Sequence, residues 1–211
     1  MRVLRSARSR RIVRSVSVAV VAILVAASSA EAQRRTAANR YDDVFRKYSK
    51  RYFGVGFDWR LFKAQGLTES NLEADAVSWV GAKGIMQLMP GTFREVSSKN
   101  PEIAQIDDPE WNIAAGIFYD RTLWRLWEKD SVEAHRREFM FASYNAGRAT
   151  IRNAQAVARR DSLDYRAWPS IEQIAPRVSR WRYRETLGYV RKIDSNFTRL
   201  DEKGNLKRPG R

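Results

Sequence analysis

Apolar residues recur at every third or fourth position along most of the chain, and this spacing predicts amphipathic helices. One such stripe runs from Tyr41 to Tyr52. A second begins after Asp58, a residue suited to capping a helix, and continues to Leu67. The same reasoning predicts further helices over 92–98, 131–142, 149–160 and 177–200, with a short turn over 171–176.

The pair Asp108-Pro109 predicts the start of a longer helix, because aspartate caps helices and proline is favoured at the first helical position. This helix is expected to run to about Glu128 and to be the central one. Alternating runs are too short for a sheet, and at most a small hairpin is expected within Val77–Leu88. The pattern predicts a mainly α fold in a single globular domain.

The two ends of the chain have a different composition. Arginines precede an apolar stretch, Val16–Ala27, of the length found in signal peptides, and Ala30-Glu31-Ala32 fits a cleavage site. We therefore predict a signal peptide over 1–32, a linker over 33–40, the domain over 41–200 and a disordered polar tail over 201–211. The expected location is the periplasm or cell envelope, and the alternative is a membrane anchor formed by an uncleaved N-terminal segment.

The composition narrows the classes of function. A formal net charge of +15 invites a nucleic-acid partner, but the basic residues are dispersed and form no recognised nucleic-acid motif. An exported basic protein is better matched to an anionic cell wall or membrane surface. There is no cysteine, which leans towards a bacterial exported protein, and His135 is the single histidine. We expect no metal, no cofactor, no nucleic acid and a monomer.

Glu69 is the first candidate for chemistry. It falls near the end of the helix that begins after Asp58, and a glycine-bracketed loop, Gly81–Gly84, follows it. A carboxyl at a helix end with apolar flanks can hold a proton near neutral pH and act as a general acid. The alternative is that Glu69 is a solvated charge that ends an amphipathic helix, and the pattern alone does not decide between the two.

Three segments carry a resemblance to a known family. They are Glu69-Ser70 with Ser78 and Gly81–Thr92, then Ser143–Gly147, then Glu185–Val190. In this order they resemble the motifs of the soluble (SLT-domain) lytic transglycosylases, the goose-lysozyme-like enzymes that cut peptidoglycan. The resemblance extends over about 41–197. It departs from the family pattern at Leu187, where an arginine is usual, and this puts the contact of that arginine in doubt.

The resemblance implies a lysozyme-like fold and a role for each matching residue. Glu69 would be the single catalytic acid and base. The implied substrate-binding residues are Ser78, Gln87, Met89, Tyr144, Asn145 and Glu185: the first two and Tyr144 would hydrogen-bond the sugar, Met89 would line the groove, Asn145 would shape a sharp turn that frees Tyr144, and Glu185 would face the cleft. The alternatives are that Ser78 and Gln87 only satisfy loop backbone and that Met89 is ordinary core.

The implied reaction is cleavage of the β-1,4 bond between N-acetylmuramic acid and N-acetylglucosamine, with formation of a 1,6-anhydromuramoyl product and without a metal. Peptidoglycan glycan strands would be the partner. Two alternatives stay open: a hydrolytic lysozyme on the same fold, and a peptidoglycan-binding protein without activity.

Overall fold

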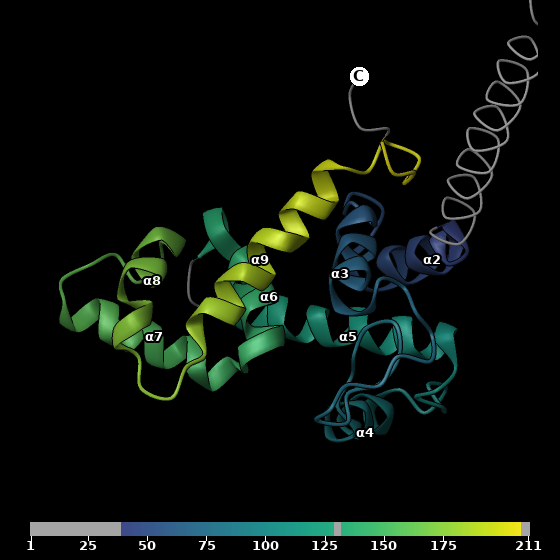
Figure 1. Ribbon diagram of the computed structural model, residues 1–211, viewed down its shortest axis with the longest axis horizontal. Coiled ribbons are helices and arrows are strands. Elements are labelled where there is room, and N and C mark those ends of the chain that lie inside the picture. Colours follow the sequence, from purple (N-terminus) through teal and green to yellow (C-terminus); the bar gives the residue numbers. More distant parts are fainter. Residues whose placement is uncertain (1–38, 129–131, 208–211) are drawn as a thin grey trace, which may run out of the picture. The chain divides into compact units, whose positions relative to one another are not determined.

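The computed structural model describes residues 39–128 and 132–207. The described residues from Tyr41 onward form one compact unit (Figure 1). The expected signal peptide and Ser131 lie outside the described residues. The helices are α2 (Asp42–Phe53), α3 (Arg60–Ser70), α4 (Pro90–Lys99), α5 (Pro109–Glu128), α6 (Arg136–Ala146), α7 (Arg148–Arg160), α8 (Trp168–Ile174) and α9 (Tyr183–Thr198), with short 3-10 helices η1 (Glu133–His135) and η2 (Ala175–Arg177).

Extended backbone is scarce in the described part of the chain. It pairs only at isolated bridges, Val77 with Lys83, Lys83 with Leu88, and Leu200 with Leu206. The prediction of a mainly α fold is confirmed, and the hairpin expected within Val77–Leu88 is reduced to the first two of these bridges. Over the residues described, no helix combines the length and the apolar character needed to cross a membrane.

Helix α5 is the centre of the packing, as its sequence predicts. The Asp108 carboxylate accepts a hydrogen bond from the backbone N–H of Trp111 at 2.9 Å, which caps the helix. Helices α2, α4 and α6 all pack against α5, while α3 packs along α9 (Figure 1). Ile113 and Ile117 are fully buried on α5. Burial of such a side chain stabilises the fold by about 1.5–3 kcal/mol, so α5 holds the surrounding helices together.

The prediction of one helix from residue 177 to 200 is wrong at its start. The backbone of Arg180 has φ 59°, in the left-handed region, and α9 begins only at Tyr183. The turn expected over 171–176 is instead the end of α8 followed by η2. Helix α8 begins at Trp168 because Pro169 is well placed in a first helical turn, where no backbone N–H is needed.

The prediction of disorder is wrong for residues 201–207. The Asp201 carboxylate accepts hydrogen bonds from backbone N–H groups of this turn, among them that of Asn205 at 2.8 Å. The carbonyl of Gly204 accepts a bond from Lys63 Nζ at 2.8 Å, and a Cβ at this glycine would overlap the ring of Trp59. The order of this segment cannot be predicted from its polar composition, because the contacts are made by backbone groups and by one glycine.

Candidate active site

Glu69 lies in the last turn of α3, as predicted. The helix ends directly after it because Asn71 adopts a left-handed conformation with φ 57°, which asparagine tolerates better than most residues. The side chain of Glu69 is partly buried and faces α9. There Tyr189 donates its hydroxyl to Glu69 Oε1 at 2.6 Å, a short bond of the kind formed with an ionisable carboxyl.

Burial raises the pKa of Glu69 from 4.5 to about 7, against the opposing effects of the Tyr189 hydrogen bond and the positive charge of Lys192. A carboxyl with this pKa is present in both protonation states at neutral pH. It can therefore donate a proton in one step and accept one in the next. Among the described residues, no group of three or more potential ligands is arranged to hold a metal ion.

The loop that faces Glu69 is held in place at two adjacent residues, Ile85 and Met86. Ser70 donates its hydroxyl to the carbonyl of Ile85 at 2.9 Å, and Tyr144 donates to the carbonyl of Met86 at 2.8 Å. The side chain of Asn112 on α5 binds the same loop. Its Oδ1 accepts from the N–H of Met86 at 2.8 Å, and its Nδ2 donates to the carbonyl of Lys83 at 3.0 Å. The loop position is thus set by α3, α5 and α6 together.

Gly84 explains the second glycine of the bracketed loop. Its backbone has φ 75°, a conformation that residues with a Cβ rarely adopt. A Cβ at this position would also overlap the side-chain amide of Asn112. The glycine is therefore required for the contact that holds the loop against α5.

The side chains of Ser78 and Gln87 bond to the backbone of their own loop. Ser78 Oγ accepts from the N–H of Ala82 at 2.9 Å, and Gln87 Nε2 donates to the carbonyls of Ala76 and Gly84 at 3.1 and 2.9 Å. The loop-backbone alternative therefore describes their contacts in the free protein.

Met89 is not ordinary core, because it is 43% exposed where α4 begins. Other apolar side chains of the loop that precedes it are exposed as well. Trp79, at the tip, is 90% exposed.

Tyr144 of the second motif lies close to Glu69, but the motif has a different geometry from the one expected. Tyr144 and Asn145 remain within α6, and the turn falls at Gly147, which has φ 84°. Tyr144 is not free, because its hydroxyl is bound to the loop. Its pKa is raised by burial and by the negative charge of Glu69. Asn145 accepts a hydrogen bond from Thr186 Oγ1 at 2.9 Å, so it connects α6 to α9.

Glu185 is exposed in the first turn of α9 and forms an ion pair with Arg182 at 2.8 Å. It makes no hydrogen bond or ion pair with Glu69. Leu187, which stands where the family motif has arginine, is buried in the core at 7% exposure. Leu187 therefore packs α9 against the core and makes no contact that an arginine could make with the Glu69 carboxyl.

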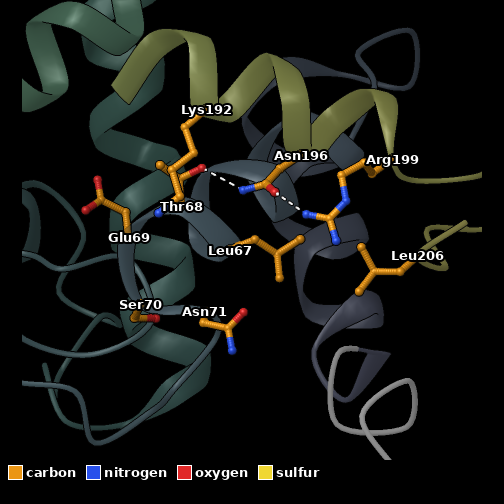
Figure 2. Close-up of a pocket in the computed structure, with 9 residues that line it drawn as sticks. All are labelled: Leu67, Thr68, Glu69, Ser70, Asn71, Lys192, Asn196, Arg199 and Leu206. Carbon is orange, nitrogen blue, oxygen red and sulfur yellow. Dashed lines mark hydrogen bonds between the residues drawn. The ribbon is translucent and has the colours of Figure 1, made fainter. Parts of the chain in front are cut away.

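A cavity of about 380 Å³ opens beside Glu69, between the end of α3 and α9 (Figure 2). Its wall is fixed by a hydrogen bond from Asn196 Nδ2 to Thr68 Oγ1 at 3.0 Å, and Arg199 in turn donates to Asn196 at 3.3 Å. Glu69 and Arg199 lie at opposite ends of this row of side chains, with Lys192 near Glu69. The cavity is polar and carries two positive charges.

Tyr189 is the functional residue that the sequence reasoning missed. It stands inside the third motif, but its spacing with the apolar residues of α9 indicated core packing alone. It is in fact 8% exposed, and its hydroxyl is the part that serves the site. Asn112 was missed for a similar reason, because a single amide in the apolar stripe of α5 gives no signal of the loop it holds.

Fold and site together define a mainly helical, lysozyme-like domain built around one protonatable glutamate. Residues 43–166 match the family model described as Transglycosylase SLT domain. The match covers more than half of the chain, and the chain belongs to this family.

The chain is similar to proteins named membrane-bound lytic murein transglycosylase F. Identity is 30% over 154 residues with that of Stutzerimonas stutzeri and 32% over 156 residues with that of Desulfosudis oleivorans. Each alignment covers 72% of this chain but only 30% and 32% of those relatives. The chain therefore spans about a third of the length of the curated relatives it matches.

Two solved structures give the same result. The 70 kDa soluble lytic transglycosylase of Escherichia coli matches with a TM-score of 0.56 and 27% identity, over 74% of this chain and 23% of that one. An inactive mutant of lytic transglycosylase Slt from Pseudomonas aeruginosa matches with a TM-score of 0.60 and 25% identity, over 75% and 23%. These matches confirm the lysozyme-like prediction.

Proposed function

We propose that this chain is a lytic transglycosylase that cleaves peptidoglycan between N-acetylmuramic acid and N-acetylglucosamine, with Glu69 as its single catalytic acid and base. The observation that carries the proposal is the partly buried carboxyl of Glu69, bonded to Tyr189, whose pKa is raised to about 7. Membership of the family supports it. So does the Pseudomonas relative, a mutant that is inactive after one glutamate was replaced by glutamine.

In the first step the protonated Glu69 gives its proton to the oxygen that bridges the two sugars. The bond from this oxygen to C1 of the muramoyl residue breaks, and the N-acetylglucosamine leaves as an alcohol. The acetamido group of the muramoyl sugar is suited to stabilise C1 meanwhile. General acid help of this kind is worth about 10²–10⁴-fold in rate.

In the second step the ionised Glu69 takes the proton from the O6 hydroxyl of the same muramoyl residue. O6 bonds to C1 and closes the 1,6-anhydro ring, and Glu69 is protonated again as at the start. Water is not consumed. A pKa near neutrality favours both steps, because neither protonation state is strongly preferred.

The substrate contacts proposed for the loop use the polar side-chain groups that are not already hydrogen-bonded to the loop backbone. The Ser78 hydroxyl keeps its proton as a donor, and Gln87 keeps its side-chain oxygen as an acceptor. Met89 offers an apolar surface at the edge of the groove. Tyr144 positions the sugar indirectly, by holding the loop, and Asn145 does so by holding α6 against α9. Glu185 would contact the substrate from the exposed first turn of α9.

We further propose that the protein is exported through its N-terminal segment and works as a monomer in the cell envelope, without metal or cofactor. The related proteins that carry the words membrane-bound in their names support a place in the envelope. The excess of positive charge suits contact with anionic wall polymers or a membrane surface.

Digestion of purified sacculi, followed by mass analysis of the fragments, tests the function. A lytic transglycosylase releases anhydromuramoyl ends that are lighter by one water than reducing ends. Reducing ends would identify a hydrolytic lysozyme instead. Sedimentation with sacculi without any released fragment would identify a non-catalytic binder. Glu69→Gln is the matched control, because it keeps the shape of the side chain and removes only its proton transfer.

A further inference from the structure

Two polar side chains lie buried behind Glu69, where the surrounding core is apolar. Gln65 is one helical turn before Glu69 on α3, and Asp120 projects from α5; both are 0% exposed. Gln65 Nε2 lies 3.5 Å from Asp120 Oδ1 and 3.2 Å from Tyr189 Oη. Since Tyr189 donates to Glu69, the four side chains form a continuous hydrogen-bonded row that ends at the catalytic carboxyl.

Gln65 and Asp120 do not stabilise the fold more than a pair of apolar side chains would. Gln65 Oε1 and Asp120 Oδ2 are buried without a hydrogen-bond partner. A buried polar atom left unpaired costs about 1–3 kcal/mol, whereas two apolar side chains of similar shape are often neutral or better. Burial also raises the pKa of Asp120 well above its ordinary value, and the charge of Glu69 raises it further.

The direction of each bond in the row follows from the atoms available. Tyrosine has one hydroxyl proton, and Tyr189 gives it to Glu69. Its oxygen can then only accept from its other neighbour, and the amide N–H of Gln65 is that donor. Asp120 Oδ1 accepts the second N–H of the same amide. If the amide were reversed, its oxygen would face Tyr189 and compete with Glu69 for the proton.

We propose that Asp120 and Gln65 are positioning residues for Glu69: Asp120 fixes the amide of Gln65 as a donor, and the amide in turn commits the Tyr189 hydroxyl to the catalytic carboxyl. The bond accepted from Gln65 also polarises the hydroxyl and strengthens its bond to Glu69. Neither residue touches the substrate.

The row of hydrogen bonds therefore keeps the pKa of Glu69 from rising further. That this pKa matters for acid and base catalysis rests on the function proposed above. The hydrogen bond from Tyr189 counteracts the effect of burial, and losing it would raise the pKa further. The other ionisable groups that face Glu69 are Lys192 from α9, Tyr144 from α6 and Asp120 itself. Lys192 and Tyr144 remain in every variant below, so a shift reports on the row of Asp120 and Gln65.

The test is a ¹³C NMR titration of the Glu69 carboxyl in the full chain, assigned by the signal that Glu69→Gln removes. Asp120→Leu should raise the midpoint by about one pH unit, because the Gln65 amide is then free to reverse. Asp120→Asn keeps a neutral carbonyl acceptor and should titrate as wild type. Gln65→Leu combined with Asp120→Leu removes the competing oxygen, so its midpoint should lie closer to wild type than that of Asp120→Leu alone.

An unchanged midpoint in Asp120→Leu overturns the proposal, as does a double variant shifted as far as the single one. A shift in Asp120→Asn as large as in Asp120→Leu would also overturn it, because the charge rather than the acceptor would then matter. If leucine prevents folding, Asp120→Ala removes the same acceptor without bulk and carries the same expectation. The titration needs no substrate. Shifted midpoints in a chain that releases nothing from sacculi would retain the inference and refute the proposed function.

Discussion

Replacing Glu69 with glutamine is expected to stabilise the fold at neutral pH, although it removes the proposed catalytic group. Burial penalises the ionised form of Glu69 and raises its pKa to about 7. Glutamine has nearly the same shape and keeps an oxygen that can accept the hydroxyl of Tyr189. The two chains therefore differ mainly in whether residue 69 can ionise.

The free energy of unfolding depends on pH because the unfolded chain loses the Glu69 proton at a lower pH than the folded chain does. Below pH 4.5 Glu69 is neutral in both, and its burial carries no ionisation penalty. Between pH 4.5 and about 7 the unfolded chain ionises first, so the free energy of unfolding of the wild type falls as the pH rises. At about 1.4 kcal/mol per pH unit the loss over this interval is about 3 kcal/mol, and above it the loss is constant.

Urea unfolding of both chains at a series of pH values from 4 to 8, in about 0.15 M salt, measures this difference. The free energy of unfolding of Glu69→Gln minus that of the wild type should rise across the interval and then level off. The effect of Asp120 is present in both chains and largely cancels. Glu73→Gln makes the same chemical change on an exposed residue of the loop after α3, and its difference corrects for removing one negative charge from a basic chain.

A difference that is flat from pH 4 to 8 would refute the reasoning, because an unpenalised carboxyl gives no such slope. A difference that falls with pH would show that Glu69 is stabilised as an anion. In that case the carboxyl could not serve as an acid at neutral pH, and the proposed mechanism would fail with it.

Three further predictions concern activity and the loop. Glu69→Gln should lower the release of fragments from sacculi by at least about 10²-fold while sedimentation with sacculi is retained; activity close to wild type would show that another group is the acid. The initial rate of the wild type should fall as the pH rises above about 7, since Glu69 must start protonated, and a rate that keeps rising to pH 9 would contradict this. Gly84→Ala should lower the free energy of unfolding by about 1–3 kcal/mol in urea titrations, because φ is 75° and the new Cβ overlaps Asn112. Gly188→Ala is its control: it lies in α9 with open space around it and should stabilise by about 0.5–1 kcal/mol.

Local signals predicted the parts of the fold that depend on neighbouring residues. Asp108 and Pro109 define the start of α5 because a cap and a fixed φ act within one turn. Glu69 was placed at a helix end for the same reason, since Asn71 leaves helical geometry directly after it. The lysozyme-like fold, by contrast, was inferred from the resemblance, because spacing alone gives a list of helices and not their packing.

The rest depends on contacts between distant parts of the chain. Tyr189 meets Glu69 across 120 positions, and nothing near Tyr189 distinguishes its hydroxyl from the edge of an ordinary core ring. Gln65 and Asp120 each look like a polar interruption of a helix until α3 and α5 are packed. The break at Arg180 was missed because an arginine in left-handed conformation has no sequence signature.

The side-chain amide of Asn112 is the contact that α5 makes with the base of the loop 77–89, and this determines which part of the loop can vary. Its contacts with this loop lie at Lys83 and Met86, so Trp79 and Val80, which are exposed at the tip, lie outside the anchored part. New sequences or small insertions at this tip can alter ligand binding while the position of Glu69 is kept. In an engineered library, the tip is where diversity belongs and Asn112 is the residue to keep.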